Sequence, residues 1–197
     1  MEKRWLVKEE NPDLILFALG WACDLQAVSH IRPAGYDILC TYDYRRMSPL
    51  PPSETENYRH VCLLAWSFGV RVSESIFRNI RFRKTIALNG TPHPVSNRFG
   101  IPVKPFLLTL RNIRSAGTEA FERRTYGKYY PIAAAWSPSR SLEEKAEELE
   151  SLYRLADEET DTPFAWDAAL VGSKDLIVPP DNQLACWQEL YPATRVT

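Results

Sequence analysis

The chain has 197 residues, of which 45% are hydrophobic and 25% charged, and its formal net charge is -1 at pH 7. This length suits one domain with a substantial core, and the composition excludes a disordered tail and a generally nucleic-acid-binding surface. A net charge so close to zero identifies no partner.

Neither a targeting segment nor a covalent cross-link is indicated. The N-terminal sequence MEKRWLVKEE is charged and lacks a signal-peptide core, and no run of about 18 apolar residues occurs. We therefore expect a cytoplasmic protein that binds no membrane. The 4 cysteines have no C-x-x-C spacing, so we expect free thiols and neither a disulfide nor a zinc site.

Six segments have strand-like sequences. Several are continuously apolar, and the intervals between them can hold helices, which is typical of a parallel sheet covered on both faces. Only Glu10, Asn11 and Pro12 separate the first two segments, so we expect the sheet to open with an antiparallel strand. The six segments are RWLVKE (4–9), DLILFAL (13–19), YDILCTYDY (36–44), HVCLLAW (60–66), KTIALNG (84–90) and FAWDAALVG (164–172).

Helical patterns occur between and after these strands. FGVRVSESIFRNI, which begins at Phe68, carries apolar residues on one face, as a helix packed on the sheet would. SLEEKAEELESLYRLADE begins with a capping box, Ser141 and Glu144, and we expect its acidic face to be solvated. Residues from about 95 to 165 contain many charges and prolines and no clear strand. We expect them to form a cap inserted in one domain that spans 1–197.

The stretch LLAWSFGV contains a single serine within an apolar run. Ser67 lies where the strand HVCLLAW ends and a helix begins, with the small residues Ala65 and Gly69 two positions to either side. The pattern A-W-S-F-G is a variant of the G-x-S-x-G nucleophile elbow, whose sharp turn strains the backbone and raises the hydroxyl clear of the sheet. We predict that Ser67 is a nucleophile. The alternative is a serine that caps an ordinary helix.

Two more segments follow in the chain order that such a hydrolase requires. The loop after an early strand supplies one N–H group to the oxyanion hole, and the residue after the nucleophile supplies the other. We predict Trp21 and Phe68 as these donors, although Trp21 also suits a core tryptophan in a plain loop. Asp175 follows the last strand-like segment and is predicted to orient a histidine, the alternative being an aspartate in a polar turn.

Five segments share the motifs of one family. LFALGWACD, YDILCTYDYR, LLAWSFGVRV, IALNGTPHPV and VGSKDLIVPPDNQ resemble the pimeloyl-[acyl-carrier protein] methyl ester esterases of biotin synthesis, which are short α/β-hydrolases. The resemblance covers most of the chain. It implies an α/β-hydrolase fold with helices on both sheet faces and a helical cap. It also implies a carboxylic ester hydrolase that converts pimeloyl-carrier-protein methyl ester to methanol and pimeloyl-carrier protein.

The same resemblance implies the roles of individual residues. Ser67 matches the nucleophile, Asp175 the triad acid, and Trp21 with Phe68 the oxyanion donors. No cofactor or metal is implied. Pocket shape cannot be deduced from one sequence, so a serine hydrolase or thioesterase acting on another acyl substrate stays open. The oligomeric state also stays open.

The triad histidine has no counterpart at its usual place. In the hydrolase order it follows the aspartate, but His30, His60 and His93 all precede Asp175. Because the last residues resemble the start of a strand, we expect that this chain stops before its last strand and the histidine-bearing loop. Alternatively His93, in T-P-H-P, serves as the base, or the protein is a hydrolase-like module that binds without cutting.

Positive charge gathers in two segments. Residues 70–84 contain 5 basic side chains and 1 acidic one, and residues 96–130 contain 7 basic and 2 acidic ones. Acyl carrier proteins are acidic, so a basic rim would steer them toward the site. The predicted carrier contacts are Arg111, Arg114, Arg123 and Arg124. The alternative is that these arginines pair with the acidic helix within the molecule.

Overall fold

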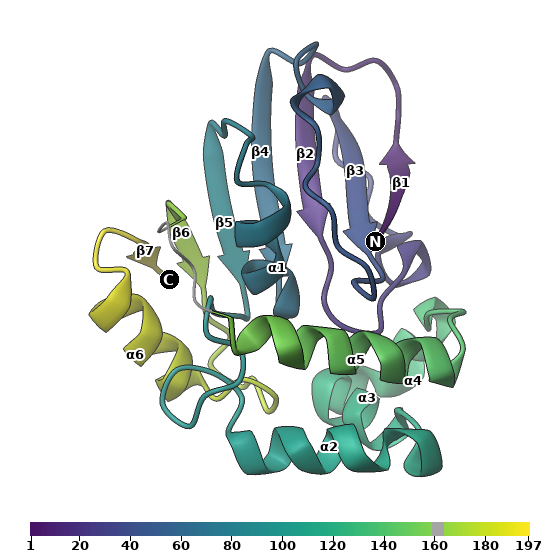
Figure 1. Ribbon diagram of the computed structural model, residues 1–197. Helices are drawn as coiled ribbons and strands as arrows, with labels where there is room; N and C mark the ends of the chain where they lie inside the picture. The colour runs from purple at the N-terminus through teal and green to yellow at the C-terminus, as the bar shows by residue number, and fades with distance from the viewer. Residues whose placement is uncertain (159–163) are drawn as a thin grey trace.

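The computed structural model describes residues 1–158 and 164–197. A 7-stranded sheet forms its centre, with the strand order β1-β3-β2-β4-β5-β6-β7 (Figure 1). In chain order the elements are β1 (Glu2–Val7), β2 (Asp13–Ala18), β3 (Tyr36–Tyr42), β4 (His60–Trp66), α1 (Phe68–Ile76), β5 (Lys84–Leu88), α2 (Val103–Ala116), α3 (Glu119–Tyr126), α4 (Tyr130–Ala133), α5 (Leu142–Ala156), β6 (Ala168–Leu170), α6 (Pro180–Leu190) and β7 (Arg195–Val196).

The first strand is antiparallel, as the sequence predicts, but its partner is β3 and not the β2 that follows it. All other neighbouring pairs are parallel. The turn after β1 is fixed from the side, because the N–H groups of Glu9 and Asn11 donate to the carboxylate of Asp37 on β3. That anchor carries the chain across the end of β3 to β2. A short spacer therefore does not produce a hairpin here.

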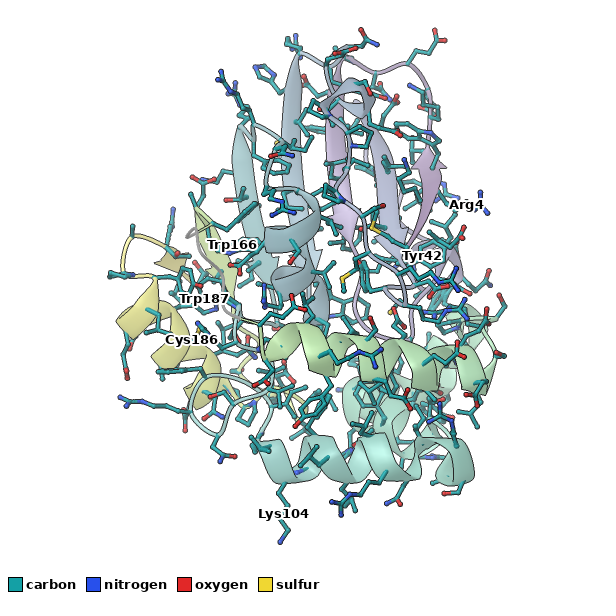
Figure 2. The ribbon with its side chains drawn as sticks, in the orientation of Figure 1. Arg4, Tyr42, Lys104, Trp166, Cys186 and Trp187 are labelled. Atoms are coloured by element: carbon teal, nitrogen blue, oxygen red, sulfur yellow. The ribbon has the colours of Figure 1, made fainter. Side chains whose placement is uncertain are left out.

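The remaining predicted strands are found, with one much shorter than expected. The segment 164–172 contributes only Ala168–Leu170 to the sheet. Its first part turns into the core, where Trp166 packs edge-on against Trp187 of α6 with ring centroids 6.0 Å apart (Figure 2). At the end of the chain, β7 pairs in parallel with β6, which confirms the strand predicted for the last residues. The strand expected beyond it stays a prediction.

The sheet has one strongly buried face. Along β4, Val61, Leu63 and Ala65 point to a large apolar cluster that also includes side chains of α1, α5 and α6. A smaller cluster lies against β1 to β3 and includes the 3-10 segment Leu25–Val28. Among the described residues this smaller cluster includes no α-helical side chain.

The helices between β5 and β6 form the predicted cap. α2 to α5 lie beyond the carboxyl ends of the parallel strands, and α5 runs across them (Figure 1). α5 begins with the predicted capping box, in which Ser141 and Glu144 bond each other's backbone. Residues 159–163, within the predicted cap range, lie outside the described residues. No helix in the described ranges is long and apolar enough to cross a membrane.

Candidate active site

Ser67 occupies a strained turn between β4 and α1. Its backbone angles are φ 56° and ψ -124°, a conformation that costs an L-residue about 1–3 kcal/mol and persists only where the surroundings enforce it. They do so here. Its N–H donates to the Leu88 carbonyl at 2.9 Å, and a Cβ on Gly69 would lie 2.3 Å from the Ala18 carbonyl oxygen. Strand and helix can approach only because residue 69 is glycine.

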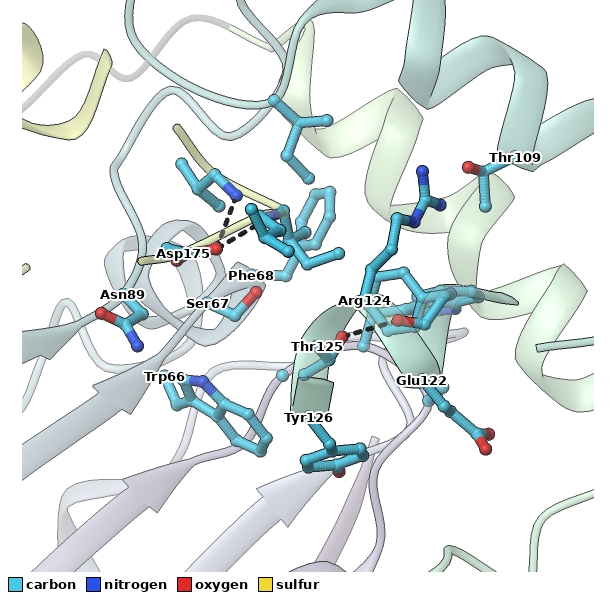
Figure 3. Close-up of a pocket in the computed structure, with 18 of the residues that line it drawn as sticks. Trp66, Ser67, Phe68, Asn89, Thr109, Glu122, Arg124, Thr125, Tyr126 and Asp175 are labelled. Atoms are coloured by element: carbon cyan, nitrogen blue, oxygen red, sulfur yellow. Dashed lines mark hydrogen bonds between the residues drawn. The ribbon is translucent and has the colours of Figure 1, made fainter. Parts of the chain in front are cut away.

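The Ser67 side chain opens into a cavity of about 520 Å³ between the sheet edge and the cap. Within the described ranges its hydroxyl has no hydrogen-bond partner. Figure 3 shows Ser67, Asn89 and Asp175 on one side of the cavity, and Thr109 and Arg124 of the cap on the other. Ser67 therefore occupies the N-cap position of α1, but its hydroxyl does not cap the helix and faces the cavity instead.

The backbone N–H groups of Trp21 and Phe68, which both line this cavity, have no protein acceptor in the described part of the chain. Phe68 is the first residue of α1, and the first N–H groups of a helix have no intrahelical acceptor. Trp21 lies in the loop after β2, and its residue neighbour Gly20 approaches the Ser67 side chain closely. The structure thus brings both predicted donors to the same cavity as Ser67.

Asp175 also lines the cavity. Its Oδ1 accepts the N–H groups of Ile177 and Val178 at 2.8 and 3.0 Å, and its Oδ2 accepts the Gln183 side chain at 3.0 Å. Burial raises the pKa of this carboxyl, and these three donors oppose the shift. The loop is held in turn by Asn89, whose Oδ1 accepts the Gly172 N–H at 2.7 Å.

A comparison with protein families identifies the family of this chain. The family model described as pimeloyl-ACP methyl esterase BioG matches residues 1–197. The chain belongs to the BioG family. This confirms the family resemblance stated from the sequence.

Two relatives are similar to the chain over most of its length. A crystal structure of BioG from Haemophilus influenzae is 32% identical, covers 100% of this chain and 91% of its own, and superposes with a TM-score of 0.89. A Bacteroides fragilis protein named malonyl-[acyl-carrier protein] O-methyltransferase is 33% identical over 90% of this chain. The chain spans only 37% of that relative's length.

More distant structures show the fold alone. A lipase-esterase related protein from Clostridium acetobutylicum, 12% identical, superposes with a TM-score of 0.65 over 100% of this chain and 88% of its own. The enol-lactonase of Burkholderia xenovorans, 13% identical, gives 0.63 over 100% and 86%. The predicted α/β-hydrolase fold is confirmed.

None of the three histidines of this BioG-family chain lines the described cavity. His60 and Asp13, which bond each other, are the first residues of β4 and β2 and lie at the ends of these strands away from the cavity. His30 packs against Trp136. His93, the alternative base, packs with its ring near Phe99. His93 therefore does not reach the cavity that contains Ser67.

The four arginines predicted to contact the carrier protein differ in their surroundings. Arg124 lines the cavity. Arg114 bonds Glu143 and Glu150 of α5, and Arg123 bonds Glu119 within α3. For Arg114 this is the internal pairing with the acidic helix that the sequence left open. No ion pair is found for Arg111 within the described ranges.

The sequence reasoning missed the role of α5. Its acidic face was expected to be solvated, but the Glu148 side chain is completely buried. This expectation is wrong at Glu148, because the carboxylate faces inward to Arg140, with an Nη1–Oε2 distance of 2.7 Å. The helical spacing of charges does not reveal which acidic residue has a buried cation opposite it.

Proposed function

We propose that this chain hydrolyses the methyl ester of pimeloyl-[acyl-carrier protein] in biotin synthesis, through an acyl-enzyme on Ser67. One observation carries the proposal: a strained serine with an unbonded hydroxyl shares a cavity with the two free N–H groups of Trp21 and Phe68. Membership of the BioG family supports the substrate. The cytoplasmic location stays a prediction.

The geometry supports the following steps. The Ser67 Oγ attacks the ester carbonyl carbon, and the electron pair moves to the carbonyl oxygen, where the Trp21 and Phe68 N–H groups stabilise the negative charge. Collapse of the tetrahedral intermediate expels methoxide, which takes up the serine proton and leaves as methanol. Water then attacks the acyl-serine, and the carboxylic acid and free Ser67 result.

The proton needs a base to carry it. In the triad chemistry a histidine removes the serine proton and delivers it to the leaving group, and a buried carboxylate orients the ring. We assign that carboxylate to Asp175. The described cavity does not supply this base. Its absence there favours a second candidate function, that of a hydrolase-like module that binds the acyl chain without cutting it.

Ser67→Ala, in the natural full-length protein, separates these candidates. We expect it to lower the hydrolysis of a carrier-bound methyl ester by at least about 10³-fold, because a covalent mechanism has no substitute for its nucleophile. The melting temperature should not fall, since the substitution removes one oxygen at a strained turn. Residual turnover within about tenfold of the parent contradicts the assignment. A parent that binds the ester but never cleaves it supports the binding module.

We further propose that the cap binds the acidic carrier protein through Arg111 and Arg124. Both belong to the basic segment 96–130, and Arg124 lines the cavity that contains Ser67. Arg114, whose guanidinium is held by Glu143 and Glu150, serves as the matched control on the same helix as Arg111.

Arg111→Glu should raise the KM for the carrier-bound ester about tenfold or more at low salt, and less at high salt, because exposed charges are screened. A short p-nitrophenyl ester, which lacks the carrier, should be unaffected. Arg114→Glu should have a smaller effect on the carrier-bound KM. Equal effects on the two substrates, or a reaction that salt does not change, would exclude this docking surface.

A further inference from the structure

The loop that contains Trp21 is tied to the cap at four consecutive residues. The bonds join the loop after β2 to residues 139–148, which lead into α5 and form its first half. Figure 1 shows where α5 lies, below the ends of the strands. They pair Trp21 Nε1 with the Lys145 carbonyl, the Ala22 N–H with Glu148 Oε2, the Cys23 carbonyl with Arg140 Nη1, and Asp24 Oδ2 with the Ser139 N–H and hydroxyl. The cap therefore holds the loop itself, and does not only cover the cavity.

Glu148 is the most buried member of this contact. Its carboxylate accepts the Ala22 N–H at 3.0 Å, the Tyr44 N–H at 2.9 Å and Arg140 Nη1 at 2.7 Å. Arg140 in turn contacts Asp43 at 3.1 Å. A buried carboxylate is costly unless donors satisfy it, and here three donors from three different segments do so. Its oxygens are thus held in one place.

The backbone of Ala22 is strained and must be stabilised by contacts of this kind. Its φ is +66°, in the left-handed region that alanine rarely adopts. Such a conformation persists only where surrounding contacts enforce it. Ala22 directly follows Trp21, and the peptide group between the two residues carries the N–H that Glu148 accepts. The direction of that peptide plane limits where the Trp21 N–H, one residue earlier, can point.

We propose that Glu148 is a positioning residue for the oxyanion hole: by accepting the Ala22 N–H, it holds the loop in the strained conformation that presents the Trp21 N–H to the cavity. The inference rests on the proposed function, because it takes Trp21 as an oxyanion donor. According to this proposal, Glu148 influences the turnover number from the cap. It is remote in sequence from Trp21 and does not line the cavity.

Glu148→Ala and Glu148→Gln test this in the natural full-length protein. Removing the acceptor should lower kcat about 10- to 100-fold, where the upper limit corresponds to losing one oxyanion donor. KM should change by less than about twofold. Glu148→Gln should lose less, because its amide oxygen can still accept one backbone donor. Ser139→Ala, which removes only a hydroxyl bond to Asp24 in the same contact, is the control and should keep kcat within about twofold.

A double variant separates positioning from simple structural support. Glycine adopts positive φ without strain. Adding Ala22→Gly to Glu148→Ala or Glu148→Gln should therefore raise kcat at least about threefold above that of the single variant. A merely structural loss would lower the melting temperature and would not be recovered at residue 22. Active-site titration normalises kcat to folded enzyme. If Glu148→Ala does not fold, Glu148→Gln and its Ala22→Gly partner give the same comparison.

The outcomes are distinct. A lowered kcat with unchanged KM and rescue by Ala22→Gly supports the inference. A folded Glu148→Ala with parental kcat, or a loss in either variant that Ala22→Gly does not relieve, overturns it while Ser67→Ala still abolishes hydrolysis. If Ser67→Ala itself retains turnover, the proposed function fails first.

Discussion

Replacing Gly90 with alanine places a methyl group against the backbone of the proposed nucleophile. Gly90 follows β5, and a Cβ built there would lie 2.4 Å from the Ser67 carbonyl oxygen and 2.8 Å from its Cα. Ordinary contacts begin near 3.4 Å, so one of the two backbones must shift by about 1 Å. Both neighbours are main chain and neither can rotate away, unlike a side chain.

The shift should affect catalysis more than stability. Forcing a methyl group into a packed site costs about 1–3 kcal/mol, whereas a displacement of about 1 Å at the reacting group can lower turnover about 10²-fold. We therefore expect Gly90→Ala to reduce kcat for a short p-nitrophenyl ester about 10²-fold while the protein remains folded. Urea unfolding measures the stability, and stopped-flow or steady-state absorbance measures kcat.

Gly35→Ala is the matched control. Gly35 has a φ of +81°, and a Cβ there would meet nothing within 4 Å. The substitution should cost about 1 kcal/mol through backbone conformation alone and leave kcat unchanged. If Gly90→Ala also keeps kcat within about threefold of the parent, the close approach to Ser67 does not control the nucleophile, and the reasoning fails.

Two further predictions concern carboxylates, the half-buried one of Asp175 and the buried one of Glu74. Asp175→Asn should lower kcat at least about 10²-fold with little change in KM, because an amide cannot hold the base in its required tautomer and orientation; an unchanged kcat in steady-state assays would place the triad acid elsewhere. Burial raises the pKa of Glu74 to about 7, with Trp166 and Arg71 opposing the shift. The folded protein therefore retains this proton up to about pH 7, whereas an unfolded chain releases it near 4.5. The free energy of unfolding should fall from pH 4.5 to 7, and Glu74→Gln should remove that part of the fall; an identical fall in both proteins in urea titrations would contradict it.

Local sequence patterns predict the elbow well. Strand, small residue, serine and helix lie within one stretch, so the pattern predicts the turn at Ser67, although the contacts that hold it come from Leu88 and Ala18. The same holds for the start of α5, where Ser141 and Glu144 cap each other across three residues. In both places the residues that define the pattern are close in sequence, and standard spacing rules apply.

Contacts between distant segments could not be predicted in this way. Glu148 lies 126 residues from Ala22 and 104 from Tyr44, and nothing in the helical charge pattern of α5 distinguishes it from its solvated neighbours. The partner of β1 was missed for a related reason. Side-chain bonds from Asp37 to the turn after β1 direct the chain across β3, and a spacer length does not encode them.

The most direct test of the account is to locate the site of covalent labelling by a fluorophosphonate in the natural full-length protein. Peptide mass spectrometry should find a single adduct on Ser67, formed more slowly when the carrier-bound methyl ester is present and absent from Ser67→Ala. Ser173 lines the same cavity and is the internal comparison. An adduct on Ser173, or no adduct on a protein that still cleaves the ester, would contradict the assignment of Ser67 as the nucleophile.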